Sequence, residues 1–130
     1  MNAVSAIKQY QQVSVSSSVM DASPHRLVQI LMEGALERIV LAKASMARNE
    51  IAMKGKSIGR AIDIVGGLQG SLNKEAGGEI AENLSSLYDY MVNRLLAANS
   101  RNDASILDEV SGLMIELKMG WDAMPDAYKH

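Results

Sequence analysis

The sequence contains no cysteine and no phenylalanine, and aromatic residues make up only 4% of its 130 residues. Without cysteine the chain has neither a disulfide framework nor a thiolate metal site, which fits a reducing compartment. The formal net charge of -2 provides no field that would attract a nucleic-acid backbone or an anionic membrane. We therefore expect a cytoplasmic protein that does not bind nucleic acid.

Long apolar runs are also missing. No run is long enough to cross a bilayer, and the first ten residues lack the apolar segment and cleavage signal of a secretory leader. A chain of 130 residues is long enough for one domain with one core. We expect a single soluble domain without membrane insertion.

Histidine is scarce, because His25 and His130 are the only two. A two-iron site in a helical bundle needs Glu-x-x-His pairs on facing helices, and a haem or zinc site needs ligands that this chain lacks. Serine nucleophiles have no interior histidine to activate them. We expect no catalytic residue, no metal and no cofactor, and we expect His25 to be part of the local surface beside a helix cap.

The triplet Gly55-Lys56-Ser57 resembles the end of a phosphate-binding loop. The full motif requires a glycine where Glu50 stands and a buried strand before it, so the match is only half of the motif. Lys54 and Arg60 flank the triplet, and we expect the basic residues of this segment to be solvated at the start of a helix. The protein is interpreted as a non-enzyme.

Helical periodicity dominates the rest of the chain. Ser23 and Pro24 form a helix start, because serine caps free N–H groups and proline tolerates the first helical position. The apolar spacing predicts helices over about 24–49, over a segment from 58 that ends near 73, from 80 to about 99–102, and from a cap at Asp103 to the region before Pro125. The Gly77-Gly78 pair is expected to break the chain before the third helix.

Four helices of comparable length with short connections predict an all-α fold, an antiparallel up-down-up-down four-helix bundle with shallow crossing angles. We divide the chain into a mobile N-terminal arm and linker (1–22), the bundle (23–124) and a loose tail (125–130). The residues best assigned to the core of the later helices are Leu84, Tyr88, Leu95, Leu113 and Leu117.

The first helix carries more apolar faces than a small bundle needs, since a surface helix requires one apolar stripe. One stripe contains Leu27, Leu31, Ala35, Ala42 and Met46, a second contains Val28, Met32, Leu36 and Ile39, and a third contains Ile30, Gly34 and Leu41. Surplus apolar surface indicates either a helix buried on most sides or a docking site for another polypeptide. Nine methionines, which re-pack readily around irregular partners, suit either role.

Several segments resemble a known family, the flagellar secretion chaperones called FliS. The resemblance spans nearly the whole chain in the right order, and its segments are Tyr10-Gln11-Gln12, SPHRLVQILMEGALERI (23–39), KGKSIGRAIDIVGGLQGSLN (54–73), GGEIAENLSSLYDYMVNRLLAAN (77–99) and Trp121. The resemblance implies a cytoplasmic chaperone that holds the disordered C-terminal segment of flagellin, prevents its premature polymerisation and delivers it to the flagellar export apparatus.

A client helix in a groove would cover the apolar stripes that the chain leaves bare. We assign Ile30, Gly34 and Leu41 to the groove wall, where Gly34 would let a client backbone come close. The resemblance supports Ile7 and Tyr10 as a lid or as client contacts. Ordinary bundle packing remains the alternative for each of these residues.

Two other classes stay open. A self-associating structural bundle would bury the surplus stripe in a homodimer and would have no flagellin client. An enzyme would require a defined pocket with convergent polar groups, which the sequence does not reveal.

Overall fold

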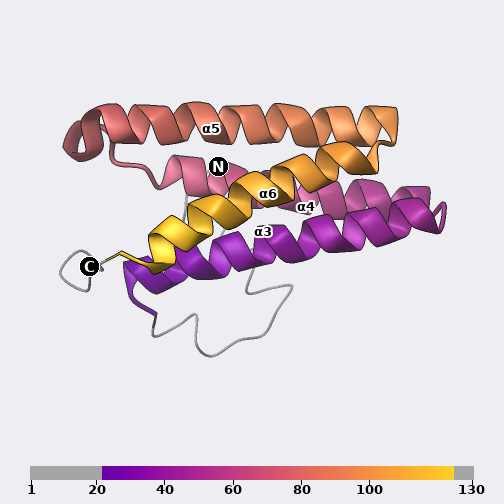
Figure 1. Cartoon of the computed structure of the whole chain (residues 1–130), viewed down its shortest axis with the longest axis horizontal. Coiled ribbons are helices and arrows are strands. Elements are labelled where there is room, and N and C mark those ends of the chain that lie inside the picture. Colours follow the sequence, from indigo (N-terminus) through magenta and orange to yellow (C-terminus); the bar gives the residue numbers. More distant parts are fainter. Residues whose placement is uncertain (1–21, 125–130) are drawn as a thin grey trace.

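The structure, a computed structural model, describes residues 22–124 and consists of helices and short connections in that range. The helices are α3 (Pro24–Ala47), α4 (Ile51–Gly70), α5 (Lys74–Arg101) and α6 (Ala104–Asp122). Consecutive helices run antiparallel, and α6 returns to pack on α3, so that the four close a ring (Figure 1). The predicted all-α up-down bundle is confirmed. The predicted arm and tail lie outside the described residues, apart from Ala22.

The helix starts follow the capping rules. The side chain of Ser23 accepts a hydrogen bond from the backbone N–H of Arg26 at 3.1 Å, and Pro24 occupies the first turn. Asp103 accepts a hydrogen bond from the backbone N–H of Ser105 at 2.9 Å. Both caps were predicted, because such side chains satisfy N–H groups that have no partner within the helix.

The second and third helices differ from the predicted bounds. Helix α4 already begins at Ile51, before the predicted start at 58, so Gly55 lies within the helix. Helix α5 begins at Lys74, because the side chain of Asn73 accepts from the N–H of Ala76 at 3.1 Å and nucleates one early turn. The predicted break is present as a kink at Gly78, whose φ of 53° and ψ of -128° favour glycine.

The core lies along the centre of the ring. All four helices contribute fully or almost fully buried side chains, and the largest of them are Met32, Ile39, Ile58, Leu68, Met91, Leu95, Leu107 and Met114. Tyr88 and Leu95 are buried as expected. Leu84, Leu113 and Leu117 are partly buried and pack against this core.

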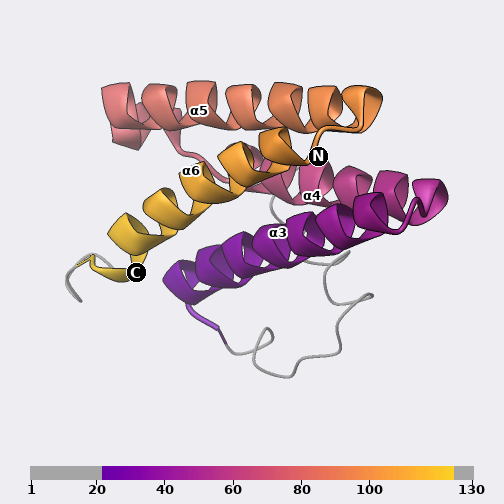
Figure 2. The same cartoon turned by 45° about the vertical axis from the view of Figure 1, so that its right-hand side comes forward.

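Helix α6 runs obliquely across the bundle. It starts beside the end of α5 and finishes beside the beginning of α3, a course that is visible in Figure 1 and after rotation in Figure 2. Since α6 has 19 residues and α5 has 28, the shorter helix leaves the first half of α5 as it crosses to α3. This divergence determines the shape of one end of the bundle.

The neighbours Leu95 and Leu96 provide a test of the core. We expect Leu95→Ala to lower the free energy of unfolding by about 2–5 kcal/mol, because Leu95 is 0% exposed and its truncation leaves a cavity. Leu96→Ala, at a position that is 53% exposed, should change it by no more than about 0.5 kcal/mol. Urea unfolding followed by circular dichroism measures both. Equal effects of the two substitutions would contradict the packing described.

Candidate docking surfaces

An apolar cavity of about 370 Å³ lies at the end of the bundle where α6 separates from α5. Its walls come from all four helices, with only a few polar side chains among them. The main lining residues are Val28, Leu31, Leu68, Leu72, Leu84, Tyr88, Leu117 and Trp121. Apolar cavities of this size are typical of binding sites for ligands or for the side chains of a partner.

His25 and Trp121 form one wall of the cavity. Their rings are stacked with centroids 4.8 Å apart and planes within 9° of parallel. The Nε1–H of Trp121 donates a hydrogen bond to the backbone carbonyl of His25 at 3.0 Å. Beside them, the side-chain amide of Gln29 donates to Asp122 at 2.7 Å. These contacts fasten the end of α6 to the beginning of α3.

The prediction that His25 belongs to the local surface is wrong. Its residue is 6% exposed, because the indole of Trp121 covers one face of the imidazole. Neither ring nitrogen has a hydrogen-bond partner among the described residues. Buried polar atoms are nearly always paired in proteins, so this ring is an unusual component of a cavity wall.

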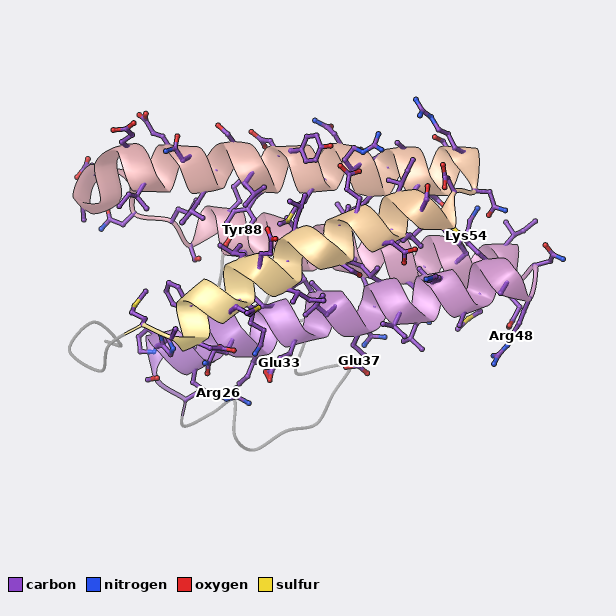
Figure 3. All side chains as sticks on the ribbon, viewed as in Figure 1. Arg26, Glu33, Glu37, Arg48, Lys54 and Tyr88 are labelled. Atoms are coloured by element: carbon purple, nitrogen blue, oxygen red, sulfur yellow. The ribbon has the colours of Figure 1, made fainter. Side chains whose placement is uncertain are left out.

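Tyr88 points from α5 into the bundle, towards the side where α6 crosses (Figure 3). It is 3% exposed and lines the same cavity. Burial disfavours the charged phenolate and raises the pKa of Tyr88 to about 12. In the folded protein Tyr88 is therefore uncharged over the whole physiological pH range.

Helices α5 and α6 are joined in the second half of α5. Arg94 donates from Nε to Oε1 of Glu109 at 2.7 Å, and the Tyr90 hydroxyl donates to the other oxygen of that carboxylate. These two hydrogen bonds, that of Tyr90 first, lower the pKa of the Glu109 carboxyl below its usual value. The junction marks the point from which the two helices diverge.

The opposite end of the bundle contains a buried lysine. Lys54 was expected to be solvated, but it is buried, and its Nζ donates to the backbone carbonyl of Asn99 at 3.2 Å and to Oδ1 of Asn102 at 3.1 Å. Asn102 caps α5 in the left-handed conformation, so the ammonium neutralises the partial negative charge of that helix end. Figure 3 places Lys54 far from Arg26 at the start of α3.

The three residues assigned to the groove wall of α3 differ in exposure. Ile30 and Gly34 are buried, and Leu41 is 42% exposed. Ile30 precedes Met32 by two residues, which places it about 200° round the helix from this core residue. Ile30 and Gly34 are thus covered on their own side of α3, and only Leu41 leaves the assigned stripe open. Ile7 and Tyr10 lie outside the described residues.

Residues 22–124 contain neither a cluster of metal ligands nor a helix fit to span a membrane. This part of the chain has no group of three or more His, Asp or Glu side chains arranged to hold a metal ion. None of its helices combines the length and the apolar character that a membrane span requires.

The described residues thus form a small helical bundle with an open apolar cavity and further exposed apolar side chains, a surface of the kind that a partner can cover. The model of the family described as "Flagellar protein FliS" matches residues 6–128. The chain belongs to the FliS family, which confirms the resemblance seen in the sequence. The names of its relatives describe chaperones, a class of protein that is not an enzyme class.

Three curated relatives show the extent of this similarity. The flagellar secretion chaperone FliSB of Pseudomonas aeruginosa is 55% identical over 95% of this chain and 98% of its own length. The flagellar secretion chaperone FliS of Vibrio cholerae is 45% identical, with 95% of this chain and 90% of the relative covered. FliS of Salmonella typhimurium is 48% identical, with 93% and 90% covered.

The raised pKa of Tyr88 predicts a loss of stability at alkaline pH. This pKa rises from 10.0 to about 12 on folding. The stability that the neutral phenol contributes is therefore fully present below pH 10 and is lost as the pH rises towards 12. At pH 11 the free energy of unfolding should be lower by about 1 kcal/mol for this reason. Tyr88→Phe should lose less stability than the parent chain between pH 9 and pH 11 in denaturant titrations. Equal losses in both proteins would contradict the assigned environment of Tyr88.

Proposed function

We propose that this protein is a cytoplasmic export chaperone that binds the disordered C-terminal segment of flagellin in apolar grooves. The observation that carries the proposal is the FliS family match over residues 6–128, together with chaperone relatives that align over nearly their whole length. Bound in this way, the client segment cannot drive premature polymerisation. The chaperone then aids delivery of flagellin to the flagellar export apparatus.

The surface of α3 supports a helix-in-groove mode of binding. Leu41 leaves 42% of its surface exposed on the side of α3 that the core does not use. Gly34 lies seven residues earlier and therefore on nearly the same face, but it is buried, so Leu41 is the accessible part of this stripe. Ile30 extends the apolar stripe by a further turn. An amphipathic client helix would dock apolar side chains along this face.

Ordering of the client is part of the mechanism. A disordered segment that becomes helical on binding loses conformational entropy, and apolar burial must exceed a cost of about 2–5 kcal/mol. Binding is therefore strong only for a segment whose apolar spacing matches the groove. This requirement gives selectivity without any catalytic chemistry.

Ile7 and Tyr10 are proposed to act as a lid or as client contacts. An arm that occupies part of the groove in the absence of client would shield apolar surface from aggregation. Such a lid lowers the apparent affinity for the client in proportion to the fraction of molecules that are open. Shortening the arm would then tighten client binding.

A self-associating bundle is the second candidate. The observation that favours it is the set of exposed apolar side chains on α3 and α4, among them Val40, Leu41, Ile51 and Met53, which a homodimer would cover. In that case the protein would have no flagellin client, and its dimer would persist at low concentration.

Adjacent positions on α3 provide a matched test. We expect Leu41→Asp to weaken binding of a fluorescent peptide from the C-terminal segment of flagellin at least tenfold, because the substitution places a charge in the groove wall. Val40→Asp lies about 100° round the helix at a position that is 65% exposed, and it should change the affinity less than twofold. Fluorescence anisotropy measures both affinities.

Circular dichroism of each variant shows that the fold is retained, which is expected because both positions are exposed. Ile30→Asp is a less direct test, since Ile30 is buried and a charge there would also destabilise the bundle. Equal affinities of the Leu41 and Val40 variants would exclude this face of α3 from the groove. If even the parent chain does not bind the peptide, the proposed client is wrong.

A further inference from the structure

One titratable side chain in the cavity wall has no part in the proposed client groove. His25 lies in the first turn of α3, directly after Pro24, and its residue is 6% exposed. Neither Nδ1 nor Nε2 of its ring has a hydrogen-bond partner among the described residues. Histidine is the side chain that ordinarily changes its charge between pH 5 and 8. A proton added to this ring therefore changes the wall of the cavity.

The same ring belongs to the contact that holds the end of α6. The imidazole stacks on the indole of Trp121, and the backbone carbonyl of His25 accepts a hydrogen bond from the indole Nε1–H. The end of α6 lies beside the beginning of α3, as Figure 1 shows for the yellow end of α6. In the described part of the chain, one further hydrogen bond joins these two helix ends, from Gln29 to Asp122. A change at His25 therefore acts on the attachment of α6.

Asp122 is the carboxylate of α6 that responds to charge on His25. Its pKa is lowered mainly by the hydrogen bond from Lys118 and, to a smaller extent, by the proximity of His25. Both of its oxygens are already engaged, because Oδ1 accepts from Gln29 at 2.7 Å and Oδ2 accepts from Lys118 at 2.6 Å. Asp122 therefore attracts a positive charge on His25 while two other donors hold it.

No carboxylate is present among the described residues that line the cavity. On α3 the neighbouring Arg26 is positively charged and is paired with Glu33 at 3.3 Å. On α5 the phenol of Tyr88 stays neutral, because burial raises its pKa to about 12. The end of α4 contributes residues 71–73 to the cavity, and none of these titrates. A proton on His25 thus has Asp122 as its one compensating charge among these groups.

Protonation changes the forces on the ring. A neutral imidazole leaves one donor and one acceptor without a partner in this wall, whereas an imidazolium leaves two donors and a full positive charge. The face of an indole attracts a cation, but this attraction is smaller than the cost of burying an unpaired charge away from water. The charged ring is therefore more stable when it turns to solvent, which separates it from Trp121.

We propose that the contact between His25 and Trp121 is an acid-sensitive latch, in which protonation of His25 releases the last turn of α6 from the beginning of α3 and uncovers the apolar cavity. The latch is closed in neutral solution and opens as the pH falls towards 5. Because His25 is not part of the hydrophobic core, the release is local. The latch does not depend on the identity of the client, so it goes beyond the proposed function and is tested on the protein alone.

Trp121 is the only tryptophan of the chain and reports directly on the latch. We expect its bimolecular constant for quenching by acrylamide to rise about twofold or more between pH 7.5 and pH 5.0, because local release exposes the indole. This constant is corrected for the fluorescence lifetime, so quenching by the charged imidazole itself does not enter it. An unchanged constant, or a loss of helical circular dichroism over the same pH range, would overturn the proposal.

His25→Phe is the matched variant, because a phenyl ring stacks on an indole but binds no proton. The adjacent cavity of about 370 Å³ leaves room for the larger ring. The quenching constant of this variant should be the same at both pH values, with the helical signal of the parent chain. A pH response equal to that of the parent would overturn the proposal, since a group other than His25 would then be responsible.

Asp122→Asn tests the direction of the effect. Asparagine keeps an oxygen for Gln29 but removes the charge that favours a proton on the closed latch, so the midpoint of the quenching change should move to higher pH by about half a unit. The control is Asp108→Asn, in the same helix and paired with Lys43, which should leave the midpoint unchanged. A shift to lower pH, no shift, or an equal shift in the control would overturn the proposal.

Binding of an apolar dye tests whether the cavity is uncovered. The emission of anilinonaphthalene sulfonate should rise in the parent chain over the pH range in which Trp121 becomes accessible, because the dye reports exposed apolar surface. His25→Phe should show a smaller rise over the same range, which accounts for the general effect of pH on an anionic dye. Equal rises in both proteins would show that the cavity stays covered and would overturn the proposal.

Discussion

The attachment of α6 to the beginning of α3 determines which apolar surfaces this bundle hides. The stacking of His25 on Trp121, the indole hydrogen bond and the Gln29–Asp122 pair hold the end of α6 against α3. Because α6 is also fastened to Arg94, in the second half of α5, through Glu109, it crosses the bundle obliquely. The first half of α5 keeps α4 as its neighbour, through hydrogen bonds from Gln69 to Ser85 and Asp89, and the apolar cavity lies where α6 moves away towards α3.

This arrangement gives a folded bundle that still exposes apolar surface. A continuous core from all four helices supplies stability, while further apolar residues remain exposed on α3 and around the cavity beside Trp121. Exposed apolar surface in a soluble chain is a risk for aggregation unless a partner covers it. Membership of the FliS family provides a reason to retain that surface, because a secretion chaperone must bind another polypeptide.

Local sequence was sufficient for most of the fold. The apolar periodicity predicted all four helices, and the caps at Ser23 and Asp103 fixed the starts of the first and the last, since these signals depend on residues within one or two turns. The start of α4 at Ile51 was missed, because the apolar pattern was read only from Ile58. The early turn of α5 was missed because a glycine pair reads as a break. In the structure Asn73 starts a helical turn before the kink at Gly78.

The site was harder to predict, because its contacts join distant parts of the chain. His25 is covered by Trp121, 96 residues later, and Lys54 is held by Asn102, 48 residues later. Neither burial has a local signature. Periodicity identified the third apolar face of α3. It shows on which side of the helix a residue lies, but not which other element covers that side. Ile30 and Leu41 therefore share a predicted stripe although their exposure differs.

A disordered client segment is proposed to fold onto apolar surface of this bundle. Calorimetric titration with the C-terminal flagellin peptide at several temperatures tests it most directly, with a scrambled peptide of the same composition as the control. We expect one-to-one binding with a large negative heat-capacity change that is absent for the scrambled peptide. Absence of binding, or the same heat-capacity change with both peptides, would contradict it.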